Sequence, residues 1–286
     1  MKDFEVRQSN LDDFKTAVSW AHAEGWNPGH DDLPPFFAAD RNGFLMGYLD
    51  DEPISSISVV RYDDNYGFLG FYIVHPDHRG KGYGMATWNA GMSYLDGCTI
   101  GLDGVVEQQD NYKKSGFGFA GRTIRYAGIP DQDVTSVGNC EISPVAGTHM
   151  DAVLEFDRNC FPAPRNDFLH HWLNPGDDSR RHSFVAMQDG TFSGYATIRK
   201  CQQGYKIGPL FALAPEAARS LFNACCSRVE PGAQVIIDVP ESNTEAIAMA
   251  QDHGLEPVFE TARMYRGTHP QLETRRIFGS TTLELG

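Results

Sequence analysis

Residues 68–95 read FLGFYIVHPDHRGKGYGMATWNAGMSYL, and the fold is decided within this stretch. Residues 68–74 are almost all apolar, aromatic or β-branched, which predicts a buried strand. A turn rich in glycine and basic residues follows at 79–84, and a helical pattern then runs from residue 85 to about residue 95. The first amides of a helix have no partners within it, so strand, turn and helix together predict an anion-binding site.

The glycines of this turn allow the backbone to approach an anion closely, and Arg79 and Lys81 add two positive charges. Two common phosphate-binding patterns do not fit. The string G-x-x-x-x-G-K-[ST] of the P-loop does not occur, and the dinucleotide pattern G-x-G-x-x-G lacks its third glycine. The pattern that remains is R-x-x-G-x-G, which is formed by Arg79, Gly82 and Gly84 behind the strand.

A second apolar strand is predicted at residues 99–106, and Tyr112, Gly116 and Phe117 follow it in the pattern Y-x-x-x-G-F. With both patterns in this order, the chain resembles the GNAT superfamily of N-acetyltransferases. In that family the R-x-x-G-x-G loop binds the pyrophosphate of acetyl-CoA, and the tyrosine lies beside the thioester. The resemblance implies that an acetyl group moves from acetyl-CoA to an amine by direct attack, without an acyl-enzyme.

The resemblance assigns the binding of acetyl-CoA to one continuous segment. The strand edge would pair with the pantetheine amides, and a backbone N–H near Ile73 would polarise the thioester carbonyl. The residues assigned to the co-substrate are Tyr72, Ile73, Val74, Arg79, Gly80, Lys81, Gly82, Tyr83, Gly84 and Met85. Tyr112 is assigned as the hydrogen-bond donor or general acid for the departing thiolate, and the alternative is a tyrosine that only packs.

The region after the first helix lines the acceptor site in GNAT proteins, and here it contains Trp26 and Asp32. These side chains would hold an amine by cation–π and charge contacts, and the alternative is a core tryptophan and a helix-capping aspartate. The strand at 68–74 has no carboxylate, although some relatives keep a glutamate base there. Cys98 is not favoured as a nucleophile because no paired base is evident. The general base is therefore left open among Asp32, Asp63, Asp103, Glu107 and His75.

The second half of the chain repeats the first. The ending KKSGFGFAGRTIRYAG at 113–128 aligns with QDHGLEPVFETARMYRG at 251–267, which indicates an internal duplication. The second copy has no glycine between Ala212 and Leu221, and Ala250 stands at the position of the tyrosine. Without the glycines the backbone cannot close on a pyrophosphate.

The duplication leads to a specific prediction of fold and domains. We expect an α/β (α+β) protein with two tandem GNAT folds, each a mixed, mostly antiparallel twisted sheet flanked by helices. The predicted domains are a catalytic domain at 1–130, a degenerate GNAT-like domain at 139–268 and a C-terminal tail at 269–286, with a polar linker before residue 139.

Composition excludes several classes of function. The net charge of −14 would repel nucleic acid and anionic membranes. The sequence contains no apolar run of 18 residues, which a membrane-spanning helix would need. The six cysteines form no C-x-x-C pattern and are interpreted as reduced thiols of a cytoplasmic protein. No metal site is expected, because the adjacent His170 and His171 would point about 100° apart on a helix.

The sequence thus predicts an N-acetyltransferase that uses acetyl-CoA to acetylate the primary amine of a small molecule. A second interpretation is a non-catalytic sensor or scaffold that binds acetyl-CoA. The sequence leaves open the identity of the acceptor and the oligomeric state.

Overall fold

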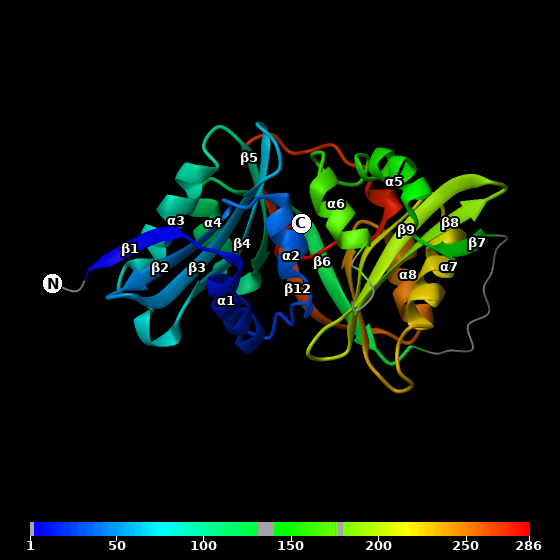
Figure 1. Cartoon of the computed structure of the whole chain (residues 1–286), viewed down its shortest axis with the longest axis horizontal. Helices are drawn as coiled ribbons and strands as arrows, with labels where there is room; N and C mark the ends of the chain where they lie inside the picture. Colours follow the sequence, from blue (N-terminus) through cyan, green and yellow to red (C-terminus); the bar gives the residue numbers. More distant parts are fainter. Residues whose placement is uncertain (1–2, 131–139, 175, 177–179) are drawn as a thin grey trace.

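The computed structural model describes residues 3–130, 140–174, 176 and 180–286. Figure 1 shows two halves side by side, each with a twisted sheet and helices packed against it. The predicted linker at 131–139 lies outside the described residues.

The first half contains the elements predicted around the motif. Its strands are β1 (Phe4–Gln8), β2 (Phe44–Leu49), β3 (Glu52–Arg61), β4 (Tyr66–Val74), β5 (Thr99–Val105) and β6 (Gly118–Gly128). Its helices are α1 (Leu11–Ala23), α2 (Leu33–Ala39), α3 (Tyr83–Tyr94) and α4 (Gln109–Lys114). The side chain of Asn10 caps the first helix, because it accepts a hydrogen bond from the amide of Asp13 at 2.9 Å.

The second half follows the same order of elements. Its strands are β7 (Cys140–Pro144), β8 (Arg181–Gln188), β9 (Thr191–Lys200), β10 (Tyr205–Ala212), β11 (Val235–Pro240), β12 (Glu256–Arg266) and β13 (Ile277–Gly279). Its helices are α5 (Met150–Asp157), α6 (Asn166–Leu173), α7 (Pro215–Cys226) and α8 (Thr244–Asp252). By its place in this order, β10 corresponds to β4 of the first half.

The two halves exchange their last strands. In the described residues the strand order is β1-β2-β3-β4-β5-β12-β6-β11-β10-β9-β8-β7. Strand β12 of the second half therefore pairs with β5 of the first, and β6 of the first half pairs with β11 of the second. Both exchanged strands run through the centre of the molecule in Figure 1.

This exchange corrects the predicted domain boundaries. A division at residue 130 assigns β6 to the first domain, but β6 lies between β12 and β11. Residues 256–266 in turn complete the sheet of the first half. The two predicted units are present, but neither is one continuous segment of the chain.

A shared core also holds the halves together. Helices α2 and α6 pack against each other, and the ring of Phe36 stacks on that of Trp172 with centroids 6.0 Å apart. Both side chains are fully buried, in one cluster that also contains Phe14 and Phe168. We infer that the halves fold as one unit, since separating them would expose these aromatic side chains to water.

The predicted C-terminal tail is an integral part of this structure. Strand β13 pairs with β10, and the amide of Ser280 donates to the carbonyl of Asp238 on β11 at 2.8 Å. The segment thus fills the gap between β10 and β11, which corresponds to the gap between β4 and β5 in the first copy. The expectation of a C-terminal tail at 269–286 is wrong, because residues 277–286 are almost all buried. The segment runs from β13, beside β10 in the second half, to a C-terminus near the middle of the molecule (Figure 1).

The C-terminal segment passes so close to β4 that a glycine is required there. A Cβ atom on Gly70 would overlap the backbone carbonyl of Glu284. We therefore expect Gly70→Ala to lower the free energy of unfolding by about 1–3 kcal/mol, measured by urea denaturation. The control is Gly121→Ala on β6, where a Cβ would meet nothing within 4 Å. Equal stability of the two variants would show that the segment moves aside freely.

Candidate functional site

The site is formed where strand β4 separates from β5. The two strands pair in parallel only from Tyr66 opposite Thr99 to Leu69 opposite Leu102. Just beyond, the register of β4 against β3 shifts, and Phe71 has the left-handed φ of +44°. A side chain of this size is strained at positive φ, so the bulge is a fixed bend that turns the end of β4 away from β5.

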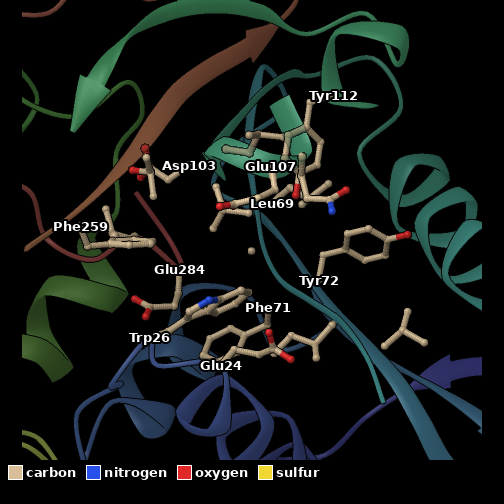
Figure 2. Close-up of a pocket in the computed structure, with 18 of the residues that line it drawn as sticks. Glu24, Trp26, Leu69, Phe71, Tyr72, Asp103, Glu107, Tyr112, Phe259 and Glu284 are labelled. Atoms are coloured by element: carbon tan, nitrogen blue, oxygen red, sulfur yellow. The ribbon is translucent and has the colours of Figure 1, made fainter. Parts of the chain in front are cut away.

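A cavity of about 530 Å³ occupies the gap between the diverging strands. Figure 2 shows Tyr72 and Tyr112 on one side of this cavity, with Phe259, Glu284 and Trp26 on the opposite side. Its lining residues are Glu24, Trp26, Leu69, Gly70, Phe71, Tyr72, Ile73, Val74, Arg79, Leu102, Asp103, Val105, Glu107, Gln108, Tyr112, Arg125, Phe259, Thr261, Leu283 and Glu284.

The glycine-rich turn follows β4 and opens helix α3. Gly80 and Gly82 have φ values of +74° and +89°, and a Cβ on either would meet nothing within 4 Å. Gly82 is also the N-cap residue of α3, so free helix amides lie next to this open space. The turn therefore fits an anion such as the pyrophosphate of acetyl-CoA.

Gly84 has a packing role in addition to the binding role that the motif predicts. A Cβ there would lie 2.9 Å from the hydroxyl of Tyr72 and 3.0 Å from a methyl group of Val74. The glycine is thus required for the close packing of α3 on β4. Tyr72 is in turn held by the indole of Trp88, with ring centroids 5.2 Å apart.

The two basic residues of the turn lie differently. The Nε of Arg79 donates to the carbonyl of Val74 at 2.9 Å, and its guanidinium forms an ion pair with Glu24 at the cavity. Lys81 is exposed, and its ammonium donates to the carbonyl of Asp77 at 2.7 Å. An anion at the turn would therefore compete with Glu24 for Arg79.

The remaining residues assigned to acetyl-CoA surround the turn. The side chain of Ile73 is buried in the core, so only its backbone is available to a ligand. Tyr83 packs on Phe4 with ring centroids 4.8 Å apart, and Met85 is 61% exposed on the surface of α3. These positions leave the binding roles of Ile73, Tyr83 and Met85 as predictions.

Tyr112 lines the cavity. Its ring stacks on Trp88 with centroids 5.7 Å apart, and Gly104 makes room for it, because a Cβ on Gly104 would lie 2.8 Å from the ring. Burial, with a contribution from Tyr72, raises the pKa of Tyr112 to about 12. The phenol is consequently protonated, and able to donate, throughout the neutral range.

The structure separates the two residues that were predicted to hold the amine. Trp26 lines the cavity, whereas Asp32 does not. Asp32 is 2% exposed and accepts hydrogen bonds from Arg181 at 3.3 Å and Arg199 at 3.1 Å. Asp32 is therefore an ion-pair partner between the halves, and the prediction that it binds the amine is wrong.

The candidate general bases differ in whether they line the cavity. Asp103 and Glu107 line the cavity, but Arg263 of β12 binds the carboxylate of Asp103 at 2.8 and 2.7 Å. Asp63 and His75 are absent from the cavity lining. The carboxylate of Asp63 instead accepts two backbone amides of the turn before β4, and His75 precedes the 3₁₀ turn at Pro76–His78.

Sequence reasoning missed the part of the wall that comes from the exchanged strands and the C-terminal segment. Arg125 lies on β6, Phe259 and Thr261 lie on β12, and Leu283 and Glu284 follow β13. The repeat at 251–267 marks the position of β12 in its own copy, but it carries no sign that this strand crosses to the other half. No motif marks Glu284.

The comparisons with known proteins agree with this geometry. A model described as the acetyltransferase (GNAT) family matches residues 6–117, and one described as an acetyltransferase (GNAT) domain matches residues 153–279. A holothin acyltransferase from a Pseudoalteromonas species is 36% identical over 280 residues, which covers 98% of this chain and 94% of the relative. The chain belongs to the GNAT acetyltransferase family. As a member of this family it is an acyltransferase.

Solved structures show the same tandem arrangement of the GNAT fold. A protein from Pyrococcus horikoshii superposes with a TM-score of 0.82 at 20% identity, covering 100% of this chain and 97% of that one. A tandem GNAT protein from the clavulanic acid biosynthesis pathway has a TM-score of 0.64 at 14% identity, covering 93% of this chain and 100% of that one. At these identities the likeness concerns the fold alone.

Within the described residues, no three His, Cys, Asp or Glu side chains gather in a way that would hold a metal ion. None of the helices that the structure describes has the length and apolar character needed to span a membrane.

Proposed function

We propose that this protein is an acetyl-CoA-dependent N-acetyltransferase that acetylates the primary amine of a small molecule by direct attack. The observation that carries the proposal is the cavity between β4 and β5, which is lined by Arg79 of the glycine-rich turn, by Tyr112 and by a wall of aromatic and acidic residues. We also propose a cytoplasmic location, in keeping with six free cysteines.

The residues present fit acetyl-CoA in this proposal. The amides at Gly82 and the start of α3, with Lys81, would hold the pyrophosphate, and the free edge of β4 beyond Leu69 would bind the pantetheine amides. Acetyl-CoA supplies the acetyl group and the thiolate leaving group. Arg79 would exchange its ion pair with Glu24 for one with the phosphates.

Tyr112 would assist the departure of the thiolate. A thiol has a pKa of about 8.5, well below the value of about 12 for Tyr112, so full transfer of the phenolic proton to the thiolate is unfavourable. We therefore propose that Tyr112 donates a hydrogen bond to the sulfur and keeps its proton. The thiolate would then take a proton from solvent on release.

The acceptor is proposed from the shape and charge of the opposite wall. Trp26, Phe259 and Leu283 offer apolar surfaces, while Glu107 and Glu284 offer carboxylates. These groups suit a small amine with a flat apolar body. The relative at 36% identity is named as a holothin acyltransferase, so holothin is the first acceptor to test.

The enzymatic proposal predicts the behaviour of Tyr112→Phe. We expect kcat to fall about a hundredfold, because the hydrogen bond to the leaving sulfur is lost, while acetyl-CoA affinity stays within about twofold. The rate is measured as CoA release with benzylamine, tryptamine and holothin, and the affinity by calorimetry. Since the phenol titrates only near pH 12, wild type and variant should share the same pH profile from about pH 6 to 9.

The same assay separates the enzyme from a sensor. A wild-type protein that binds acetyl-CoA tightly but releases no CoA with any amine would support the sensor instead. A protein that does not bind acetyl-CoA would contradict both interpretations.

A further inference from the structure

Two buried polar atoms in the wall of the cavity have no protein partner. Among the described residues, Oε2 of Glu284 and Oγ1 of Thr261 make no hydrogen bond, although their residues are only 3% exposed. Both residues line the cavity, and both come from the second half of the chain. A buried carboxylate oxygen without a partner is costly, which indicates that a ligand supplies the missing donor.

The backbone around Glu284 is held in place by its neighbours. Its carbonyl packs against Gly70 of β4, immediately before the bulge at Phe71. The next residue, Leu285, donates its amide to Thr282 at 2.9 Å and accepts from the hydroxyl of Tyr62 at 2.8 Å. The C-terminal segment thus positions one carboxylate beside the strand that would hold the thioester.

The cations around Glu284 are already engaged elsewhere. Its charge acts on Arg125, Arg199 and Lys206, which lie on β6, β9 and β10. Arg125 binds Asp238 at 2.7 and 2.9 Å, Arg199 binds Asp32, and Lys206 donates to the carbonyl of Trp26 at 2.7 Å. None of these three cations fills the hydrogen-bonding position of Oε2.

We propose that Glu284 and Thr261 form the acceptor subsite, in which Glu284 binds the amine and takes its proton. The proposal rests on the proposed acetyltransferase function and extends it. An alkylamine has a pKa of about 10 and must lose a proton before it attacks. The nitrogen then bonds to the acetyl carbon, the C–S bond breaks, and the sulfur leaves with the electron pair.

The protons balance in this scheme. The nitrogen loses two protons in all. Glu284 takes the first, before the attack, and passes it to solvent. The second leaves for solvent once the nitrogen has bonded to the acetyl carbon, and the thiolate takes one proton from solvent, so one proton is released overall. The acceptor class is a primary amine carried by a flat apolar group, because Trp26 and Phe259 lie beside Glu284 on the same side of the cavity (Figure 2). Thr261 would hold a second polar group of the acceptor.

The test uses Glu284→Gln with benzylamine, which is protonated at neutral pH, and aniline, which is not. We expect kcat/KM for benzylamine to fall about a hundredfold, and that for aniline to change less than about fivefold. The acetyl-CoA affinity and the melting temperature, measured on the same samples, should stay close to those of the wild type. Glu273→Gln removes an equal charge from an exposed position of the same segment and should leave all values unchanged. Thr261→Val should raise KM about fivefold.

Several outcomes would overturn the inference. If Glu284 only balances the charge of Lys206, Glu284→Gln will melt earlier and keep its full rate per folded molecule. An equal loss with both amines would exclude a role in proton removal. Wild-type protein that binds acetyl-CoA but acetylates neither amine would refute this acceptor class, whereas a lack of acetyl-CoA binding would refute the proposed function itself.

Discussion

Replacing Gly82 by valine is expected to weaken acetyl-CoA binding roughly a thousandfold, or about 4 kcal/mol. Gly82 has a φ of +89° at the N-cap of α3, a conformation that costs a β-branched residue about 1–3 kcal/mol. A valine side chain would also enter the open space in which we propose that the pyrophosphate lies. The affinity is measured by calorimetry with acetyl-CoA.

The control for this variant is Gly97→Val, just after α3. Gly97 has a φ of +83°, and a Cβ atom added there would meet no atom within 4 Å, as at Gly82. Both variants therefore carry a similar backbone strain and should lose similar stability. Gly97→Val should nevertheless bind acetyl-CoA as the wild type does. Equal affinities for the two variants would remove the assignment of the glycine-rich turn.

The turn could be predicted from the sequence because its chemistry is local. A strand, a pair of left-handed glycines and a helix start are all encoded within residues 68–95, and the structure places them as the pattern indicates. Tyr112 could be predicted for the same reason, because Gly116 and Phe117, which complete its pattern, follow it closely in the sequence. The second half repeats the same local order of strands and helices, so the second GNAT unit could also be predicted.

The strand exchange could not be predicted in this way. Strands β6 and β12 come from aligned segments of the two copies, so each has the pattern needed to complete either sheet. Only three-dimensional packing selects the partner. The pairing of Asp103 on β5 with Arg263 on β12 illustrates this choice, because it joins residues 160 positions apart. No spacing rule connects them.

The acceptor wall depends on that same long-range packing. Sequence reasoning assigned the amine to Asp32 because this residue follows the first helix, but the carboxylate is occupied by Arg181 and Arg199. Glu284 instead reaches the cavity after β13 has crossed the second half. Residues of the degenerate second copy therefore line the cavity of the first copy. The corresponding gap in the second copy, between β10 and β11, is filled by the segment that carries Glu284.

The second large effect is expected from Asp32→Asn, which should lower the free energy of unfolding by about 3–5 kcal/mol. The buried guanidiniums of Arg181 and Arg199 lie 4.2 and 4.9 Å from the centre of the Trp172 ring, and Asp32 forms an ion pair with each of them. Without this charge, each of the two buried cations would lose an ion-pair partner. The loss is measured by urea denaturation at neutral pH.

The stabilisation by Asp32 should also depend on pH in a defined direction. Burial alone would raise the pKa of Asp32, but Arg199, Arg181 and the amide of Gly29 outweigh it and hold the pKa below its usual value. A carboxyl group with a lowered pKa stabilises the fold above its unfolded pKa of about 4, and this contribution is lost as the pH falls through the folded value. The stability difference between wild type and Asp32→Asn should therefore shrink below about pH 4.

A matched control removes the charge of Asp12, which is exposed and pairs with Lys15 on the surface of α1. Asp12→Asn should change the free energy of unfolding by less than about 1 kcal/mol, because water already solvates both partners. If Asp32→Asn proved as stable as Asp12→Asn but bound the amine poorly, Asp32 would return to the acceptor site. A large loss of stability with unchanged acetyl-CoA affinity would instead establish it as the ion pair that joins the two copies.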